Sequence, residues 1–150
     1  MKVYVDNAMI RKESTQDLVY YAAKWFGRQR RIGDKVRLIV NGTVYRPKDD
    51  AQAECVQWEK NLYCILLDKA MIRDLGQKRF SALQVLFHEL EHVHQYHRGD
   101  LTIRKGLLHW RGMVVQHLDW DDCPHEQEAD DNGEFMARCW LAQQKNRGAK

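Results

Sequence analysis

Residues 85–92 read Val-Leu-Phe-His-Glu-Leu-Glu-His, and they lie inside a run whose apolar residues recur at helical spacing. This spacing predicts a helix over residues 79–97. Residues four apart lie on one face of a helix, so His88 and His92 can present two imidazoles to a single metal ion. Glu89 lies about 100° further around the helix, within reach of a water molecule on that ion. The opposite arc is apolar and would seat the helix in the core, through Leu83, Leu86, Leu90 and Val93.

Two imidazoles and a neighbouring carboxylate supply much of what zinc-assisted hydrolysis requires, but a catalytic zinc has three protein ligands. The third is expected on a second helix, predicted over residues 125–145. Glu126 and Asp130 lie about 40° apart on one arc of that helix, among small residues that would allow close helix approach. We predict Glu126 as the third metal ligand and Asp130 as the acceptor for the free N–H of a ligand imidazole. Glu128 points about 160° away from Glu126 and is the alternative ligand.

The pattern His-Glu-x-x-His, followed by Glu-x-x-x-Asp on a second helix, resembles the gluzincin zinc metallopeptidases. The form here is similar to compact single-domain proteins of that kind from phage and bacterial genomes. Trp110-Arg111-Gly112 adds to the resemblance, because those proteins place a short Trp-x-Gly hairpin between the two helices. The resemblance covers about residues 80–140. It implies a zincin-like fold, Zn²⁺ on His88, His92 and Glu126, Glu89 as general base, and hydrolysis of a peptide or protein substrate.

Two other functions remain open on the sequence alone. One is a zincin scaffold that binds a partner and keeps zinc only for structure, although such a site has no use for the Glu89 carboxylate. The other is a DNA-associated protease resembling the SprT-like group, in which a histidine would be the third ligand. His109 and His117 are the weaker candidates for that ligand or for stabilising an oxyanion. Nucleic acid would then contact the basic N-terminal third, which contains the nearly contiguous Arg28, Arg30 and Arg31. The alternative is that these three arginines are simply solvated.

Length and composition fit one globular domain over residues 1–150, with 44% hydrophobic and 30% charged residues. No apolar run approaches the length of a membrane span, and the N-terminus lacks the apolar stretch of a secretory signal. We therefore expect a cytoplasmic protein (in the host cytoplasm if it is phage-encoded) with no membrane partner. Its cysteines would then be reduced thiols. The alternative is a disulfide between Cys55 and Cys64, which flank a predicted turn.

Alternation of apolar residues and turn signals predict the remaining elements. The result is an α+β domain in which a mostly antiparallel sheet packs on the metal-site helices. An N-terminal helix and the sheet would occupy residues 1–77, and the metal-site helices with their intervening hairpin residues 78–145. The strand over residues 62–67 is expected at the sheet edge, where an extended peptide could pair with it. The other predicted elements are a strand at 2–5, a helix at 14–27, a hairpin of 36–40 and 43–46 around Asn41-Gly42, a strand at 55–58 and a hairpin over 107–118.

Overall fold

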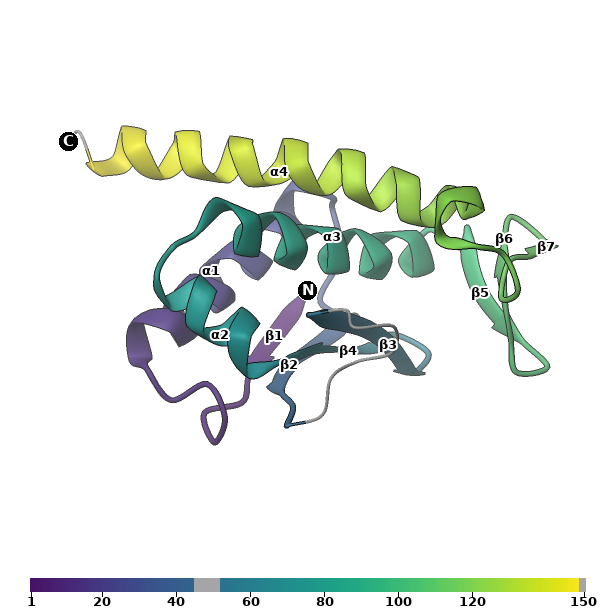
Figure 1. The fold of residues 1–150 in the computed structure, drawn as a ribbon, viewed down its shortest axis with the longest axis horizontal. Helices are drawn as coiled ribbons and strands as arrows, with labels where there is room; N and C mark the ends of the chain where they lie inside the picture. Colours follow the sequence, from purple (N-terminus) through teal and green to yellow (C-terminus); the bar gives the residue numbers. More distant parts are fainter. Residues whose placement is uncertain (45–51, 149–150) are drawn as a thin grey trace.

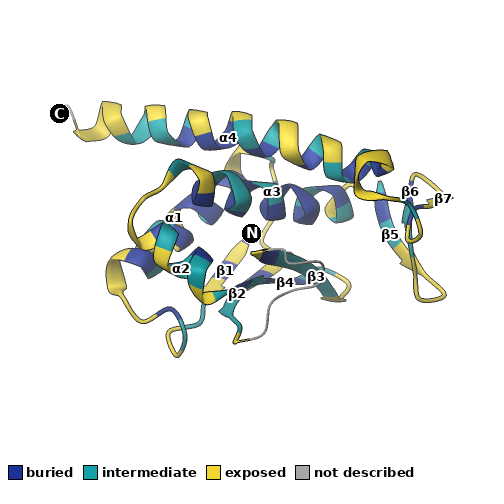
Figure 2. Ribbon diagram, in the orientation of Figure 1, coloured by how far each residue is buried: buried dark blue, intermediate teal, exposed yellow. Residues whose placement is uncertain are grey.

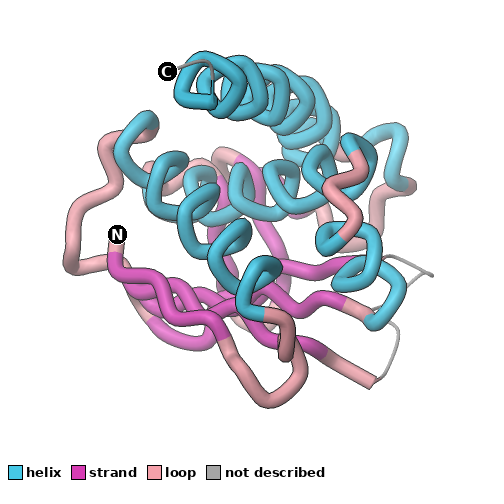
Figure 3. The backbone as a smooth tube through the Cα atoms, turned by 90° about the vertical axis from the view of Figure 1, so that its left-hand side faces the viewer, coloured by secondary structure: helices cyan, strands magenta, loops and turns pink. Residues whose placement is uncertain are grey.

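The two helices predicted to carry the metal ligands lie side by side and run in opposite directions (Figures 1 and 3). They are α3, Phe80–His97, and α4, Pro124–Gly148. These bounds come from a computed structural model, which describes residues 1–44 and 52–148. The antiparallel arrangement brings the middle of α3 against the beginning of α4, so the two candidate metal motifs meet.

A glycine sets how closely these helices approach. A Cβ atom at Gly133 of α4 would lie 2.8 Å from the backbone nitrogen of His88 and 2.9 Å from its Cα. Real Cβ atoms do not approach a backbone that closely, so a larger residue would force the helices apart. Ala129 and Ala137, one turn to either side, are fully buried. The small residues expected on this arc therefore do line the helix contact.

The main sheet corrects the prediction of a mostly antiparallel arrangement. Its strands are β1 (Lys2–Val5), β2 (Arg37–Gly42), β3 (Ala53–Glu59) and β4 (Leu62–Leu67), in the order β1-β2-β4-β3. The β1–β2 and β2–β4 pairs are parallel, and only the β3–β4 hairpin is antiparallel. The α+β class itself is confirmed, because the helices gather on one side of this mixed sheet (Figure 1).

The hairpin predicted at Asn41-Gly42 does not form there. Both residues stay in β2, and Gly42 pairs with Leu67 in the parallel ladder. The glycine serves a close approach instead of a turn, because a Cβ at position 42 would lie 2.4 Å from the Cβ of Met9. Of the predicted partner strand over 43–46, residues 43 and 44 are outside any strand, and residues 45 and 46 lie outside the described part of the chain.

The predicted edge strand is also wrong. β4 lies between β2 and β3, so its backbone is paired on both sides. The edge strand next to β4 is β3, and it packs beside α3. A short helix, α2 (Lys69–Gly76), follows β4 and was not predicted from the sequence. Its first turn is capped by the carboxylate of Asp68, which accepts a hydrogen bond of 2.7 Å from the backbone N–H of Met71.

The core lies between the sheet and the layer formed by α3 and α1 (Glu13–Gln29) (Figure 2). α1 confirms the N-terminal helix predicted over 14–27. The apolar arc predicted for the metal helix is buried here, and Leu86, Leu90 and Val93 have no exposed surface. Phe87 contributes to a cluster of aromatic rings and lies 5.8 Å from Trp25, centroid to centroid. This packing seats α3 firmly and turns its remaining face toward α4.

One of the three arginines offered as nucleic-acid contacts is used inside the fold. The guanidinium of Arg30, just after α1, donates from Nε (3.1 Å) and from an Nη atom to Oε1 of Glu91 on α3. Glu91 is completely buried, so the pair links two helices through a charge that has left water. Arg28 and Arg31 are exposed. The expectation that all three arginines share one solvated surface is therefore wrong for Arg30.

A second, antiparallel sheet follows α3 at one end of the molecule (Figure 1). It contains β5 (Leu101–Arg104), β6 (Leu107–Trp110) and β7 (Met113–Val114). The hairpin predicted around Arg111-Gly112 is confirmed, with φ of 48° and 85° at these two residues, as a tight two-residue turn requires. β5 was not predicted. A 3-10 turn, η2 (Trp120–Asp122), leads into α4.

The cysteines of the described chain are free thiols. Cys55 pairs with Ile65 across the β3–β4 hairpin, whereas Cys64 pairs with Val56. Neighbouring strand positions face opposite sides of a sheet, so this register separates the two thiols and explains why they do not form a disulfide.

None of the described helices is both long enough and apolar enough to cross a membrane.

Candidate metal centre

Three side chains from α3 and α4 converge on one point. Nε2 of His88 lies 3.1 Å from Nε2 of His92. The Glu126 carboxylate reaches both rings, with Oε2 at 3.0 Å from His88 Nε2 and Oε1 at 3.3 Å from His92 Nε2. Ligands held about 2.0–2.1 Å from a tetrahedral zinc stand roughly 3.3 Å from one another. The spacing of these atoms therefore fits a single small cation.

Glu89 belongs to the same cluster. The ligand atoms of His88, Glu89 and His92 all lie within 4.8 Å of one another. Glu126, however, is the carboxylate that contacts both imidazoles, so Glu89 is left beside the centre. Only 7% of Glu89 is exposed, and this burial raises the pKa of its carboxyl group. A carboxylate with a raised pKa is suited to accept a proton near neutral pH.

The charges in the cluster support one another. Burial opposes protonation of His92, but the hydrogen bond to Glu126 and the nearby Glu89 carboxylate outweigh it and raise the pKa of His92 to about 9. The pKa of His88 is raised for the same reasons. Burial alone would raise the pKa of Glu126, but its hydrogen bonds to the two imidazoles outweigh burial and lower this pKa well below the usual value. A metal ion on the Nε2 atoms would displace these imidazole protons.

The outward nitrogen of each imidazole also has a partner. Nδ1 of His88 lies 2.7 Å from Oδ1 of Asp130, the position predicted for this residue. Nδ1 of His92 lies 2.8 Å from Oε1 of Gln95, a contact that the sequence analysis missed. Acceptors on both Nδ1 atoms keep N–H groups there, so the Nε2 atoms, which face the centre, are the ones that would bind a metal ion after losing their protons. The two imidazoles are therefore already turned for metal binding.

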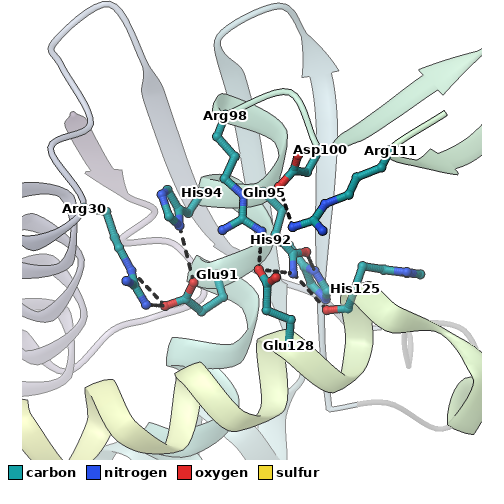
Figure 4. Close-up of polar contacts among 10 residues, drawn as sticks. All are labelled: Arg30, Glu91, His92, His94, Gln95, Arg98, Asp100, Arg111, His125 and Glu128. Atoms are coloured by element: carbon teal, nitrogen blue, oxygen red, sulfur yellow. Dashed lines mark hydrogen bonds and ion pairs between the residues drawn. The ribbon is translucent and has the colours of Figure 1, made fainter.

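The alternative ligand is not brought to the centre. Oε1 of Glu128 accepts hydrogen bonds from the guanidinium of Arg98 and, at 3.3 Å, from Nε2 of Gln95 (Figure 4). Glu128 thus supports the site from outside, as its predicted direction on the helix requires. His109 and His117 are also elsewhere. Nδ1 of His109 bonds the Leu107 carbonyl at 2.9 Å, and His117 is exposed.

His125 is a second neighbour that the sequence analysis missed. Its Nε2 atom lies 3.4 Å from Oε1 of Glu126, and only 4% of the residue is exposed. Burial lowers the pKa of His125, which favours a neutral ring beside the cluster. Its Nδ1 atom is buried without a hydrogen-bond partner among the described residues. The sequence did offer a signal for this contact, because His125 immediately precedes the candidate ligand Glu126.

The cluster opens to a cavity of about 640 Å³. Its walls come from three elements, so a bound molecule would contact α3, α4 and the beginning of β3 at once. His88 and Glu89 lie in the wall, next to Ala53 of β3. The lining residues are Gln52, Ala53, Gln84, Val85, His88, Glu89, Asp130, Asp131 and Glu134. The candidate centre is therefore accessible from solvent on the side where Glu89 lies.

Comparisons of this chain with models of known protein families, with curated proteins and with solved structures found no match.

Proposed function

We propose that this protein is a zinc-dependent metallopeptidase of the gluzincin type, with His88, His92 and Glu126 as the zinc ligands. One observation carries the proposal: the two Nε2 atoms and the Glu126 carboxylate lie at the mutual spacing of zinc ligands, beside a buried fourth group, Glu89, at an open cavity. The order of the motifs along the chain and the hairpin between the two helices support the same assignment. The fold proposed with it is a compact zincin-like domain.

When bound, zinc would polarise a substrate carbonyl and make a water molecule acidic near neutral pH. The chain's own residues supply the remaining steps. Glu89 accepts a proton from the attacking water and delivers it to the leaving amine. Asp130 and Gln95 hold the ligand imidazoles in orientation. The backbone of β3, in place of the predicted β4, would pair with an extended peptide beside the cavity.

The structural-zinc alternative fits the centre less well. Structural zinc sites are closed by four protein ligands. In this centre one carboxylate contacts both imidazoles, while Glu89 lies beside them at the cavity. Placing a carboxylate there costs desolvation free energy, as its raised pKa records. That cost is easier to understand if the carboxylate acts on a water molecule.

Replacement of Glu89 by glutamine tests the proposal. Zinc content and melting temperature should survive Glu89→Gln, because the side chain keeps its shape. Turnover of a peptide library should fall by about 10²–10⁴-fold, because glutamine cannot accept the proton. The matched control is Glu59→Gln at the exposed end of β3, which should behave as wild type. Loss of zinc from Glu89→Gln would make this residue a ligand. Equal, negligible turnover by wild type and variant would favour the structural-zinc alternative.

Nucleic-acid binding is a second candidate, favoured by one observation. Four cations surround a cavity of about 290 Å³ between the beginning of α1 and one face of α2, and none of the described residues that line it is acidic. These cations are Arg11, Lys12, Lys69 and Arg73. This surface replaces the arginines around position 30 as the place where phosphates would bind. Salt-dependent binding of labelled DNA, lost when Arg11 and Lys69 are changed to glutamate, would support it, and anisotropy unchanged by added protein would exclude it.

We also propose that the protein acts in the cytoplasm, where the free thiols at positions 55, 64, 123 and 139 would remain reduced.

A further inference from the structure

Gln95 is a polar residue without any exposed surface, and it lies against the candidate ligand His92 (Figure 4). Its Oε1 atom is 2.8 Å from Nδ1 of His92. Its Nε2 atom is 2.9 Å from the backbone carbonyl oxygen of His125 and 3.3 Å from Oε1 of Glu128. Each polar atom of this buried amide is thus used, and its contacts join α3 to the first turns of α4.

These contacts fix which way the amide faces. A carbonyl oxygen and a carboxylate oxygen only accept hydrogen bonds, so the NH₂ group of Gln95 must face His125 and Glu128. The reversed amide would place its oxygen against two acceptors in a buried site, which would leave hydrogen bonds unmade. Oε1 therefore faces His92. It can only accept, so Nδ1 of His92 carries a proton, and Nε2 is the nitrogen left to bind a metal ion once its own proton is displaced.

An ion-pair network holds the amide from the other side. Glu128 accepts from the guanidinium of Arg98, which also donates from Nε to Oδ2 of Asp100 at 2.6 Å. The Arg98 guanidinium lies over the Trp110 ring of the second sheet, 5.7 Å from its centroid. Gln95 is thus fixed between His92 and a charged cluster at the end of α3. Asp130, which orients the other imidazole, has a side chain that is 49% exposed, and no such network among the described residues holds it.

We propose that Gln95 is a positioning residue that sets the tautomer and the ring orientation of His92, and that the Arg98–Glu128 pair keeps the Gln95 amide in the orientation this requires. The functional part of this inference, that the orientation of His92 serves metal binding, rests on the proposed function. Its geometric claim, a proton on Nδ1 of His92, concerns the chain alone and can be tested without activity.

The test uses the nearly isosteric variant Gln95→Met, with Gln127→Met on the exposed side of α4 as the matched control. In zinc-loaded wild type, ¹⁵N NMR should show both ligand histidines bound through Nε2 and two ring N–H protons shielded from exchange. In Gln95→Met the His92 ring proton should become exchange-labile, while that of His88 should persist. Zinc affinity should fall about 10–100-fold, as for other losses of a ligand's supporting partner. Gln127→Met should change neither measurement.

Several outcomes would overturn the inference. One is a folded Gln95→Met variant with wild-type zinc affinity and an unchanged His92 ring proton. If that variant does not fold, the same ring-proton measurement on wild type and on Arg98→Met tests the inference instead. Arg98 is suitable because it lies at the surface end of the network. A proton on Nε2 of His92 in the metal-free wild type at alkaline pH overturns it, as does a His92 proton equally shielded in Arg98→Met. Wild type that binds no zinc but carries the proton on Nδ1 would instead refute the proposed function and leave Gln95 in its positioning role.

Discussion

Replacement of Gly133 by alanine should damage the metal centre more than the fold. The added Cβ would lie 2.8 Å from the His88 backbone nitrogen, whereas ordinary contacts begin at 3.4 Å, so α4 must move away from α3 by about 0.6 Å. The same shift would lengthen the 2.7 Å bond between His88 and Asp130 to about 3.3 Å, beyond the usual range for an N–H···O bond. Zinc–ligand distances tolerate only about 0.2 Å. The candidate ligands on the two helices would therefore no longer fit one ion.

The free energy of unfolding should change much less. Overpacking costs about 1–3 kcal/mol, and alanine returns roughly 1 kcal/mol of helix propensity relative to glycine. A net loss of at most about 2 kcal/mol leaves most domains folded. The variant should therefore keep a cooperative melting transition, while its zinc affinity falls at least about tenfold in competition with a chromophoric chelator.

Gly148→Ala is the matched control, since it lies in the same helix and its added Cβ would meet no atom within 4 Å. It should bind zinc as wild type does. Wild-type zinc affinity in Gly133→Ala would refute the reasoning, because it would mean that the close approach of α4 does not set the geometry of the centre.

Three further outcomes are expected. Glu126→Gln should release zinc and Glu128→Gln should retain it, as mass spectrometry of the metal content would show; the reverse result would exchange the roles of the two carboxylates. Arg30→Ala should lower the free energy of unfolding by up to about 3–5 kcal/mol, because it leaves the buried Glu91 carboxylate with the His94 ring, 3.6 Å away, in place of a guanidinium, whereas Arg28→Ala should change it by less than about 0.5 kcal/mol in the same denaturant titrations. The raised pKa of His92 stabilises the metal-free protein fully below its ordinary value of 6.5, and this contribution is lost as pH rises through about 9, so melting temperature should fall across that window while zinc affinity rises. A melting temperature that climbs from pH 6.5 to 9 would contradict this sign.

Local spacing made much of the candidate site predictable. His88 and His92 meet because they are four positions apart on one helix, and Glu126 and Asp130 share an arc for the same reason. Which way α4 runs against α3 depends on tertiary packing, but the small arc around Gly133 indicated which face makes the contact. Gln95 was not predictable, because its role depends on acceptors contributed by α4 in three dimensions.

The sheet shows where local signals fail. Asn41-Gly42 is a strong hairpin signal when considered alone, yet the position of Met9 gives the glycine another use. β4 was expected at an edge because it was predicted to come immediately before the metal helix, but α2 lies between them and order along the chain does not fix order in the sheet. Its nearly continuous apolar sequence, Leu-Tyr-Cys-Ile-Leu-Leu, fits the central position that the structure gives it.

α4 is fastened along only part of its length. Its contacts with the candidate centre and the core extend from Glu126 to Leu141, which is half-buried against the core. The Trp140 ring packs 5.7 Å from that of Trp25, whereas the last turn, residues 145–148, is exposed. Backbone amides should therefore exchange with deuterium quickly near the C-terminal end of the helix and slowly near its beginning. A ligand that bridges α3 and α4 would slow exchange in the first turns alone. The C-terminal end of the helix would then unfold locally whether or not a ligand is bound, whereas local unfolding of its first turns would depend on whether the centre is occupied.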